Sequence, residues 1–386
     1  MAKCTKTRLY AWEIMRPVHN SNEFPTQNLY EKLRNSELEQ RDIDFVTNLV
    51  TGTLQHEITI DEILKNSCSK KTKMSGGVRA ALRLATYELK FLKKRPDVVL
   101  NEYVELVKLK AKPASGLANA ILHQVERCDF YETLNARPDE DLSEAELGSK
   151  YSLQEWTVRY LIDNLGWYDA CKFMKYSLLP AKSSSIAGIV ADTSSQEIAR
   201  AITAELAENS SFLEVGSGNG TKTALLHYFG DDFARYEILE LSEAKNKTLL
   251  KRAQKFGFRI DHAHNCDARD FRVNQLYDAI FIDAPCTGLG TIRRHPEIRK
   301  RITREAIEDH AKLGFEILEN MSQYVRPGGK LFYATCTITD EENMQVINKF
   351  LNSKSRQMFS IDKALRKPQL SETSDAHFCV MLARED

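Results

Sequence analysis

Hydrophobic residues in the first third of the chain recur at the spacing of an α-helix. The clearest series are Phe45, Val46, Leu49 and Val50, then Val78, Ala81, Leu82 and Ala85. Such spacing places the apolar side chains on one face of each helix. The few glycines and prolines fall between the periodic segments, as at Gly76-Gly77, Pro96 and Pro113. The pattern predicts an all-α bundle over residues 1–128.

From Asp192 onward, short β-rich runs alternate with helical segments. The expected strands are Ser211–Val215, Tyr236–Leu241, Arg259–His264, Asp278–Ile282, Lys330–Ala334 and His377–Leu382. The expected helices are Ala199–Leu206, Lys222–Phe229, Lys245–Phe256 and Glu305–Tyr324. This alternation is typical of a doubly wound, Rossmann-like α/β domain, which we place at residues 191–386. Residues 129–190 are expected to be an acidic linker and a short helical connector.

Composition narrows the class of protein. A chain of 386 residues, 42% hydrophobic and 28% charged, is long enough for two or three globular domains. It has no run of eighteen apolar residues, and the opening Met1-Ala2-Lys3-Cys4 lacks the apolar stretch of a signal peptide. The eight cysteines form no Cys-x-x-Cys pair, so we expect no disulfide framework and no zinc site. A cytoplasmic protein with free thiols and no membrane contact is expected.

Charge is distributed unevenly although the net charge is zero. Residues 1–128 carry 21 basic against 15 acidic side chains, or about +6, whereas residues 129–146 carry about −6. The basic residues of the helical part cluster in two groups: Lys65, Lys70, Lys71, Lys73, Arg79 and Arg83, then Lys90, Lys93, Lys94 and Arg95. They form either a solvated helix surface or a surface that binds RNA phosphates.

A glycine-rich loop joins the first expected strand to a helix. Glycine permits a tight turn and a close approach of the backbone to a ligand. Acidic residues at the ends of the first three strands suit the positively charged sulfonium and ammonium groups of S-adenosylmethionine better than they suit a negatively charged pyrophosphate. Glu240 could accept hydrogen bonds from the ribose hydroxyls, and Asp267 could bind the adenine amino group. The alternative is a structural turn with solvated acids. The expected cofactor residues are Glu214, Gly216, Ser217, Gly218, Asn219, Gly220, Thr221, Lys222, Glu240 and Asp267.

Two cysteines follow two expected strands. Cys286 lies in Asp283-Ala284-Pro285-Cys286-Thr287-Gly288, and Cys336 lies in Thr335-Cys336-Thr337. Consecutive parallel strands end at the same edge of a sheet, so both thiols and Asp283 are expected in one cleft. Carbon 5 of cytosine accepts a methyl group only after a nucleophile adds at carbon 6, and a thiolate can supply that nucleophile. Asp283 could then act as the acid at ring nitrogen 3.

Two further groups have open interpretations. The run Arg293–Glu297, with Arg299, Lys300, Arg301 and Arg304, is either a phosphate-binding surface at the mouth of the cleft or a solvated helix start. His262, His264 and Cys266 alternate along an expected strand, but no fourth ligand is evident. We therefore expect no metal there.

These motifs resemble those of the RsmB/Sun type of RNA cytosine-C5 methyltransferase. The resemblance covers nearly the whole chain. Residues 1–128 are similar to the NusB-type helical RNA-binding domain of that family, and Asp192-Thr193-Ser194-Ser195-Gln196 is similar to the segment before its first strand. The two cysteine motifs and the ending Asp375–Arg384 also match.

The resemblance implies a role for each motif. Cys336 would attack carbon 6 of cytosine, and Cys286 would assist elimination of the methylated product. Asp283 would stabilise the base at nitrogen 3 and border the cofactor. The substrate would be one cytosine of RNA, in first place small-subunit ribosomal RNA, flipped into the site of a monomeric, metal-free enzyme.

The chain departs from this family in two places. Its loop reads Gly216-Ser-Gly-Asn-Gly-Thr-Lys222-Thr instead of Cys-Ala-Ala-Pro-Gly-Gly-Lys-Thr, and the segment between Leu179 and Asp192 is shorter than expected. The shorter segment bears on which nucleotide is recognised. Two other functions remain open: an inactive RNA-binding or assembly factor with the same fold, and methylation of a small molecule or protein.

Overall fold

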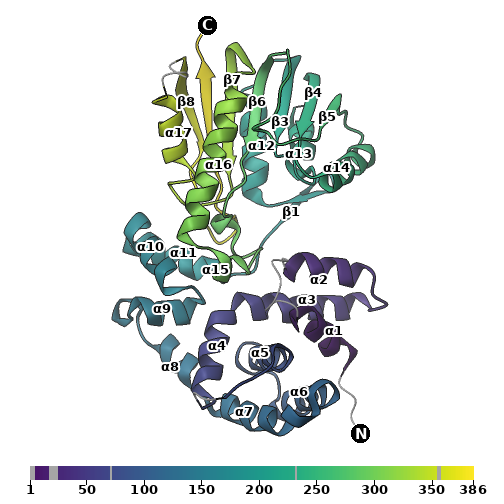
Figure 1. Cartoon of the computed structure of the whole chain (residues 1–386), viewed down its shortest axis with the longest axis vertical. Helices are drawn as coiled ribbons and strands as arrows, with labels where there is room; N and C mark the ends of the chain where they lie inside the picture. The colour runs from purple at the N-terminus through teal and green to yellow at the C-terminus, as the bar shows by residue number, and fades with distance from the viewer. Residues whose placement is uncertain (1–4, 17–24, 70–71, 231–232, 354–357) are drawn as a thin grey trace. The chain divides into compact units, whose positions relative to one another are not determined.

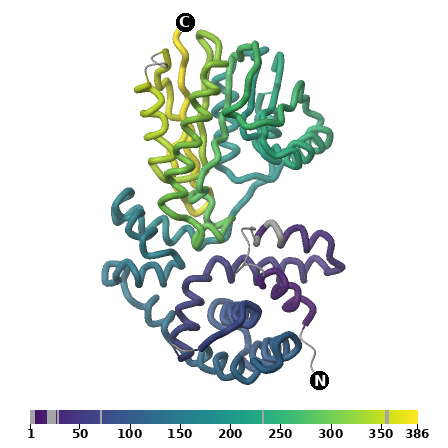
Figure 2. The backbone as a smooth tube through the Cα atoms, viewed as in Figure 1, coloured from purple at the N-terminus to yellow at the C-terminus, as the bar shows by residue number. Residues whose placement is uncertain are grey.

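The computed structural model describes residues 5–16, 25–69, 72–230, 233–353 and 358–386. The chain forms two compact units, shown as a cartoon in Figure 1 and as a backbone tube in Figure 2. Unit 1 consists of Met1–Leu178 together with His295–Arg301. Unit 2 consists of Leu179–Arg294 and Ile302–Asp386. The short segment His295–Arg301 therefore belongs to unit 1, although the chain reaches it from within the second unit.

The described part of unit 1 is helical, as the apolar periodicity predicts. Its helices are α1 (Lys6–Met15), α2 (Pro25–Arg34), α3 (Gln40–Gln55), α4 (Glu57–Asn66), α5 (Gly76–Lys90), α6 (Pro96–Ala111), α7 (Ser115–Arg127), α8 (Phe130–Ala136), α9 (Glu144–Tyr151), α10 (Glu155–Leu165), α11 (Trp167–Ser177) and α15 (Ile298–Arg301). The short 3-10 turns η2 (Lys112–Ala114) and η3 (Asp139–Asp141) join neighbouring helices.

Helix α5 is the central helix of this bundle. The Ser75 hydroxyl accepts a hydrogen bond from the backbone N–H of Val78 and so begins the helix. Every residue from Ala80 to Lys90 is buried. A helix that is buried around its whole circumference has neighbours on all sides. The core of unit 1 therefore forms around α5.

Unit 2 is an α/β domain. Its strands are β1 (Ser184–Ile186), β2 (Ile189–Ala191), β3 (Ser210–Val215), β4 (Phe233–Leu239), β5 (His262–His264), β6 (Tyr277–Asp283), β7 (Val325–Thr335), β8 (Phe359–Arg366) and β9 (Phe378–Arg384). Its helices are α12 (Thr193–Ala204), α13 (Thr221–Phe229), α14 (Glu243–Phe256), α16 (Arg304–Ser322) and α17 (Met344–Leu351), with the 3-10 turn η4 (Leu289–Thr291).

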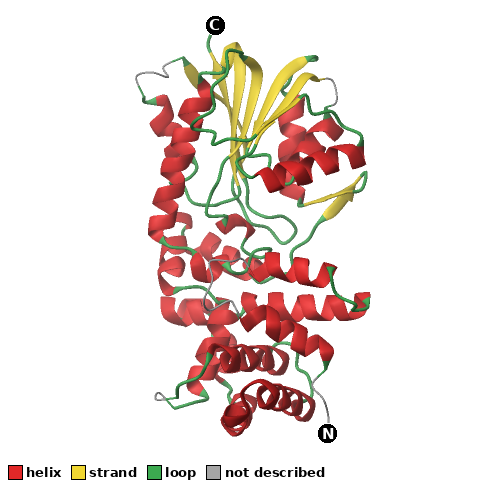
Figure 3. Cartoon of the chain, turned by 45° about the vertical axis from the view of Figure 1, so that its right-hand side comes forward, coloured by secondary structure: helices red, strands yellow, loops and turns green. Residues whose placement is uncertain are grey.

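The main sheet has the order β5-β4-β3-β6-β7-β9-β8. Strands β5, β4, β3, β6 and β7 are parallel, whereas β9 is antiparallel to both β7 and β8. Apolar residues of α12, α13 and α14 pack on one face, and those of α16 and α17 pack on the other. Figure 3 shows this sheet with helices on both sides. The α/β fold class predicted from the sequence is confirmed.

The strand order locates the position where a ligand is expected. The chain runs outward from β3 through β4 to β5 and then returns to β6 on the other side of β3. The connections after β3 and after β6 therefore leave the sheet in opposite directions. Such a reversal opens a crevice at the carboxyl ends of the two strands, where open α/β sheets bind ligands.

Candidate active site

The glycine-rich loop after β3 turns tightly against the end of β6. Gly216 has a φ of +76°, and a Cβ atom at this position would lie 2.4 Å from the carbonyl oxygen of Asp283. Only glycine fits both conditions. Next to it, the backbone N–H of Gly218 donates a 2.9 Å hydrogen bond to Glu240 at the end of β4. The loop is thus fixed to the ends of β4 and β6.

A cavity of about 510 Å³ opens at this edge of the sheet. Its lining residues come from the loops after β3, β4, β5, β6 and β7 and from α13, α14 and α16: Val215, Gly216, Gly218, Lys222, Leu239, Glu240, Leu241, Lys245, Cys266, Asp267, Ala268, Arg269, Ile282, Asp283, Ala284, Pro285, Cys286, Leu313, Ile317 and Cys336. The volume lies within the usual range of small-molecule sites. The structure therefore gathers most of the residues singled out in the sequence around one cavity.

The polar side chains of the cavity are already partly engaged. The Glu240 carboxylate also accepts a 2.9 Å hydrogen bond from the backbone N–H of Ser242. The Asp267 carboxylate accepts hydrogen bonds from the Arg269 side chain, which together with its other contacts lowers the pKa of Asp267. Lys222 Nζ donates a 2.7 Å hydrogen bond to Asp283 Oδ2. Burial acts to lower the pKa of Lys222, but the Asp283 carboxylate outweighs it and the pKa is raised.

The two cysteines lie in direct contact at the edge of the cavity. Their Sγ atoms are 3.3 Å apart, and the backbone N–H of Cys336 donates to Cys286 Sγ at 3.3 Å. The expectation that parallel strand ends bring the two thiols together is met. The backbone N–H of Ala284 also donates to the carbonyl oxygen of Ala334 at 2.8 Å, which joins the ends of β6 and β7.

The contact between the sulfurs makes the two thiols chemically different. A hydrogen bond from the Cys286 thiol lowers the pKa of Cys336, and Lys222 adds to this effect against the opposing effect of burial. The same hydrogen bond, together with burial, raises the pKa of Cys286 well above its usual value. Cys336 is therefore the more readily ionised thiol of the pair, and Cys286 is the one that keeps its proton. The arrangement sets a nucleophile next to a proton donor.

Some of the expected cofactor residues lie outside the cavity lining. Glu214 is completely buried under the loop, where Tyr236 donates a 2.7 Å hydrogen bond to it and burial raises its pKa to about 7. Gly220 packs on α14, since a Cβ atom there would lie 2.6 Å from Leu249. Three more residues complete the loop: Ser217, which is buried, Asn219, which is exposed, and Thr221, which accepts a hydrogen bond from Arg252.

The loop nevertheless fits S-adenosylmethionine in one respect that the structure tests directly. A Cβ atom added to Gly218 would meet nothing nearer than 3.9 Å, so its Cα faces open space in the cavity wall. A cofactor can therefore approach this part of the backbone closely. Glu240 lies beside it with oxygen lone pairs left to accept ribose hydroxyls.

The interpretation of the downstream arginines as a phosphate-binding surface is wrong for two of them. The Arg293 side chain has no exposed surface and donates to Asp375 at 2.6 Å. Arg299 is 1% exposed, and its guanidinium group donates to the carbonyl oxygens of Tyr151 and Ser177. Both guanidinium groups therefore donate to partners inside the protein instead of to a phosphate at the surface. Arg294 is 23% exposed and also binds Asp375.

The basic cluster of unit 1 is also partly internal. Arg83 is 1% exposed and forms ion pairs with Glu57 and Asp61. Lys90 is buried and donates to the carbonyl oxygens of Glu126 and Cys128. Lys70 and Lys71 lie outside the described residues. Among the described residues, no three or more histidine, cysteine or acidic side chains lie close enough together to bind a metal ion. His262, His264 and Cys266 are among the residues searched.

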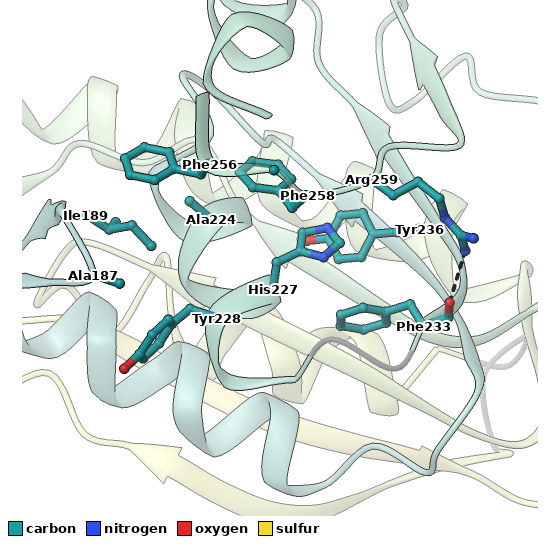
Figure 4. Close-up of a pocket in the computed structure, with 11 residues that line it drawn as sticks. Ala187, Ile189, Ala224, His227, Tyr228, Phe233, Tyr236, Phe256, Phe258 and Arg259 are labelled. Carbon is teal, nitrogen blue, oxygen red and sulfur yellow. Dashed lines mark hydrogen bonds between the residues drawn. The ribbon is translucent and has the colours of Figure 1, made fainter. Parts of the chain in front are cut away.

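A second cavity of about 530 Å³ lies at the opposite end of β4 and α13 (Figure 4). Figure 4 shows the aromatic rings of Phe233, Tyr236 and Phe258 around His227. The His227 and Phe258 rings stack with centroids 4.8 Å apart. Helix α13 thus presents Lys222 to the first cavity from its first turn and His227 to the second from its last turn. None of the residues predicted for the site lines this second cavity.

Sequence reasoning missed several residues of the site. Lys245, Arg269, Leu313 and Ile317 line the cavity. Glu342 is buried beside both cysteine loops, where it accepts hydrogen bonds from Thr287 and Thr339. The only signal for Glu342 was its position in the acidic run Asp340-Glu341-Glu342, shortly after Cys336.

Comparison with solved structures identifies the class of fold. The crystal structure of the protein PH0851 covers 100% of this chain and 100% of its own, with a TM-score of 0.77 and 18% sequence identity. At this identity the likeness concerns the fold. The sheet order, with the glycine-rich loop and the cavity at the strand ends, is that of a Rossmann-like α/β domain.

The particular family follows from sequence comparisons. Residues 201–382 match the family described as 16S rRNA methyltransferase RsmB/F, and residues 5–127 match the NusB family. The chain is 27% identical over 405 residues to the probable ribosomal RNA small subunit methyltransferase B of Bacillus subtilis, which covers 90% of this chain and 89% of that protein. It is also 27% identical to ribosomal RNA small subunit methyltransferase B of Thermus thermophilus, over 83% of this chain and 81% of that protein.

The chain thus carries an RsmB/F-family ribosomal RNA methyltransferase domain over residues 201–382 and a NusB-family domain over residues 5–127. The resemblance seen in the sequence is confirmed. Among the described residues, no helix is both long and apolar enough to cross a membrane.

Proposed function

We propose that this protein transfers a methyl group from S-adenosylmethionine to carbon 5 of a cytosine in small-subunit ribosomal RNA. The match of residues 201–382 to the RsmB/F family and the similarity to ribosomal RNA small subunit methyltransferase B of Bacillus subtilis support the ribosomal RNA substrate and the methyl donor. The observation that carries the cytosine-C5 assignment is the 3.3 Å contact between the sulfurs of Cys286 and Cys336 at the edge of the cavity. A reaction at carbon 5 needs a nucleophile and a proton-transfer group side by side, and this pair supplies both.

In the proposed reaction, Cys336 Sγ forms a bond to carbon 6 of the target cytosine. The electron pair of the carbon 5–carbon 6 double bond then becomes available at carbon 5. S-adenosylmethionine supplies the electrophilic methyl group that carbon 5 accepts. In the elimination, water or another base takes the proton from carbon 5, the electron pair of that carbon–hydrogen bond restores the carbon 5–carbon 6 double bond, and the carbon–sulfur bond breaks to release Cys336 as a thiolate. Cys286 would assist this elimination.

Other residues in and around the cavity complete the proposed site. Asp283, held by Lys222, would stabilise the base at ring nitrogen 3 and border the cofactor. The backbone of Gly216 and Gly218 would lie against the cofactor and Glu240 would bind its ribose, while Asp267, which lines the same cavity, would bind its adenine. Of the remaining loop residues, Ser217, Asn219, Gly220 and Thr221 would shape the loop, and Glu214 would support it from below.

Two cysteine variants test this reaction. We expect Cys336→Ala to abolish transfer of radioactive methyl groups from S-adenosylmethionine to unmodified 16S ribosomal RNA. We expect Cys286→Ala to accumulate a covalent protein–RNA adduct, visible as a slowly migrating band on a denaturing gel. Cys128→Ala is the matched control, because this cysteine lies in unit 1. Normal methylation by both Cys336→Ala and Cys286→Ala would falsify the mechanism.

The second candidate is a ribosomal assembly factor that retains the fold without the activity. The contact between the two thiols and the Lys222–Asp283 pair favour an enzyme, because neither is needed to bind RNA. Calorimetric titration with S-adenosylmethionine separates the two functions: an enzyme binds the cofactor, and absence of binding would favour the assembly factor. Bisulfite sequencing of ribosomal RNA from cells without the protein would identify the modified cytosine.

A further inference from the structure

Glu342 is a buried carboxylate with no role in the reaction as described so far. It lies between the end of β7 and the start of α17 and is 1% exposed. A buried carboxylate costs free energy unless hydrogen-bond donors surround it. The partners of Glu342 come from both cysteine-bearing loops, which makes its position relevant to the site.

Glu342 first binds the residue that follows Cys286. The backbone N–H of Thr287 donates to Glu342 Oε1 at 2.7 Å, and the Thr287 hydroxyl donates to Oε2 at 2.7 Å. Two hydrogen bonds to the same residue fix both its backbone and its side chain. The path of the chain just after Cys286 is therefore set by one carboxylate.

Glu342 also binds the loop that carries Cys336. The Thr339 hydroxyl donates to Glu342 Oε2 at 2.5 Å. The hydroxyl of Thr337, the residue after Cys336, lies 3.1 Å from that of Thr287 and 3.2 Å from that of Thr339. Glu342 and these three threonine hydroxyls form a closed ring, which we call the Glu342 clamp.

The neighbouring residue reinforces the clamp. Asn343 accepts a 2.5 Å hydrogen bond from the Thr335 hydroxyl and donates to the carbonyl oxygen of Thr337 at 3.1 Å. Thr335 and Thr337 flank Cys336 on either side. Consecutive residues 342 and 343 thus hold the chain around both thiols.

The donors around Glu342 match an ionised carboxylate. One backbone N–H and two hydroxyl groups donate to it, and an ionised carboxylate is a pure acceptor. Burial raises the pKa of Glu342, while the hydrogen bonds from Thr339 and Thr287 act in the opposite direction. Its charge acts to raise the pKa of Cys286, after the contact with Cys336 and burial, and it acts in the same direction on the pKa of Cys336. The charge thus opposes ionisation of both thiols.

We propose that Glu342 is a positioning residue that holds the Cys286 thiol against Cys336 and places a buried negative charge beside the pair. This role rests on the proposed function, in which Cys336 attacks the base and Cys286 assists release. Glu342 acts through the threonines of the clamp and touches neither reacting base nor cofactor.

Two variants separate the positioning from the charge. Glu342→Ala removes the clamp. Glu342→Gln can keep it, because the amide oxygen can still accept from the N–H of Thr287 while its NH₂ donates to hydroxyls that turn to accept. Glu341→Gln is the matched control, since it makes the same substitution one position earlier in the chain.

The first measurement reports the distance between the sulfurs. Phenylarsine oxide binds two thiols at close range, forming two As–S bonds and releasing water. We expect the wild-type protein, the Glu341→Gln control and Glu342→Gln to bind it equally well within about threefold, and Glu342→Ala to bind at least tenfold more weakly. Cys286→Ser should lose this binding and so assigns it to the pair.

The second measurement reports the charge. The rates at which iodoacetamide alkylates Cys286 and Cys336 are followed against pH by peptide mass spectrometry. Removing a negative neighbour favours the thiolate, so the curves of Glu342→Gln should shift to lower pH, whereas those of Glu341→Gln should not. A merely structural residue would leave the curves of the folded Glu342→Gln protein unchanged.

The outcomes are distinct. Wild-type binding of the arsenical by Glu342→Ala would overturn the positioning role, and unshifted alkylation curves in Glu342→Gln would overturn the charge role. If Glu342→Ala does not fold, the Glu342→Gln curves decide. Both measurements need neither RNA nor cofactor, so a wild-type protein that fails to methylate RNA would contradict the proposed function and leave the clamp intact.

Discussion

Asp375→Asn should unfold unit 2 more easily, because it unbalances a buried group of charges. The Asp375 side chain has no exposed surface and accepts hydrogen bonds from Arg293 at 2.6 Å and from Arg294. Arg294 also pairs with Asp192 at 3.0 Å. Two arginines and two aspartates therefore neutralise one another. The substitution keeps the shape of the side chain but leaves one positive charge without a partner.

The magnitude follows from the burial. Breaking a buried ion pair from one side costs about 3–5 kcal/mol, because the remaining charge stays desolvated. For a unit of this size, each kcal/mol lowers the melting temperature by about 2–4 °C, so the expected decrease is roughly 6–20 °C. Urea unfolding followed by far-ultraviolet circular dichroism measures the free energy. Asp362→Asn, at an exposed position of β8, is the control and should change it by less than about 0.5 kcal/mol.

The same experiment tests the alternative role of these arginines. If Arg293 bound an RNA phosphate, Arg293→Gln would reduce the slope of log affinity against log salt by about 0.7–0.9 and leave stability nearly unchanged. We expect the reverse: lower stability and an unchanged slope. A loss of less than about 1 kcal/mol in Asp375→Asn, together with a reduced slope in Arg293→Gln, would refute the structural role.

Three further predictions concern other parts of the molecule. Burial raises the pKa of Glu214 from 4.5 to about 7. Because the unfolded chain releases this proton at lower pH than the folded one, the free energy of unfolding should fall by roughly 3 kcal/mol as pH rises from 4.5 to 7. Urea titrations at several pH values should show this fall in the wild type and not in Glu214→Gln. Gly216→Ala would push a Cβ atom to 2.4 Å from Asp283 and should weaken S-adenosylmethionine binding at least tenfold by calorimetry; unchanged affinity would contradict the tight-turn geometry. Arg299→Ala should destabilise unit 1 by about 2–5 kcal/mol, measured by the fluorescence of the three tryptophans, all of which lie in unit 1; a loss below that range would mean that water replaces the guanidinium.

The sequence predicted the meeting of the two cysteines because a general rule of topology covers it. Parallel strands joined by a crossover end at the same edge, so Cys286 and Cys336 had to approach one another once β6 and β7 were recognised. The turn at Gly216 was predicted from the spacing of the glycines, and the same rule placed Glu240 beside it, because β3 and β4 are parallel. These positions depend on where each strand ends and on parallel strand direction, which the alternation of β-rich and helical segments indicates.

Features that depend on individual side-chain partners were not visible. Arg293 and Arg299 were expected at the surface. Their partners are Asp375 and the carbonyl oxygens of Tyr151 and Ser177, which lie far away in the sequence and cannot be inferred from the neighbouring residues. Strand β8 was missed because Phe359 is its only buried residue, and an edge strand with one buried side chain has no alternation to detect. Glu342 was missed because an acidic run is usually solvated.

Residues 295–301 belong to unit 1 although the chain on both sides of them belongs to unit 2, and this limits which segments can be exchanged between related proteins. A gene chimera that exchanged only residues 1–178 with a relative would place a foreign helical bundle around an inherited Arg299. Its guanidinium would then need three carbonyl oxygens, at present those of Tyr151, Ser152 and Ser177, in the same places. We therefore expect functional hybrids only when residues 1–178 and 295–301 come from the same parent.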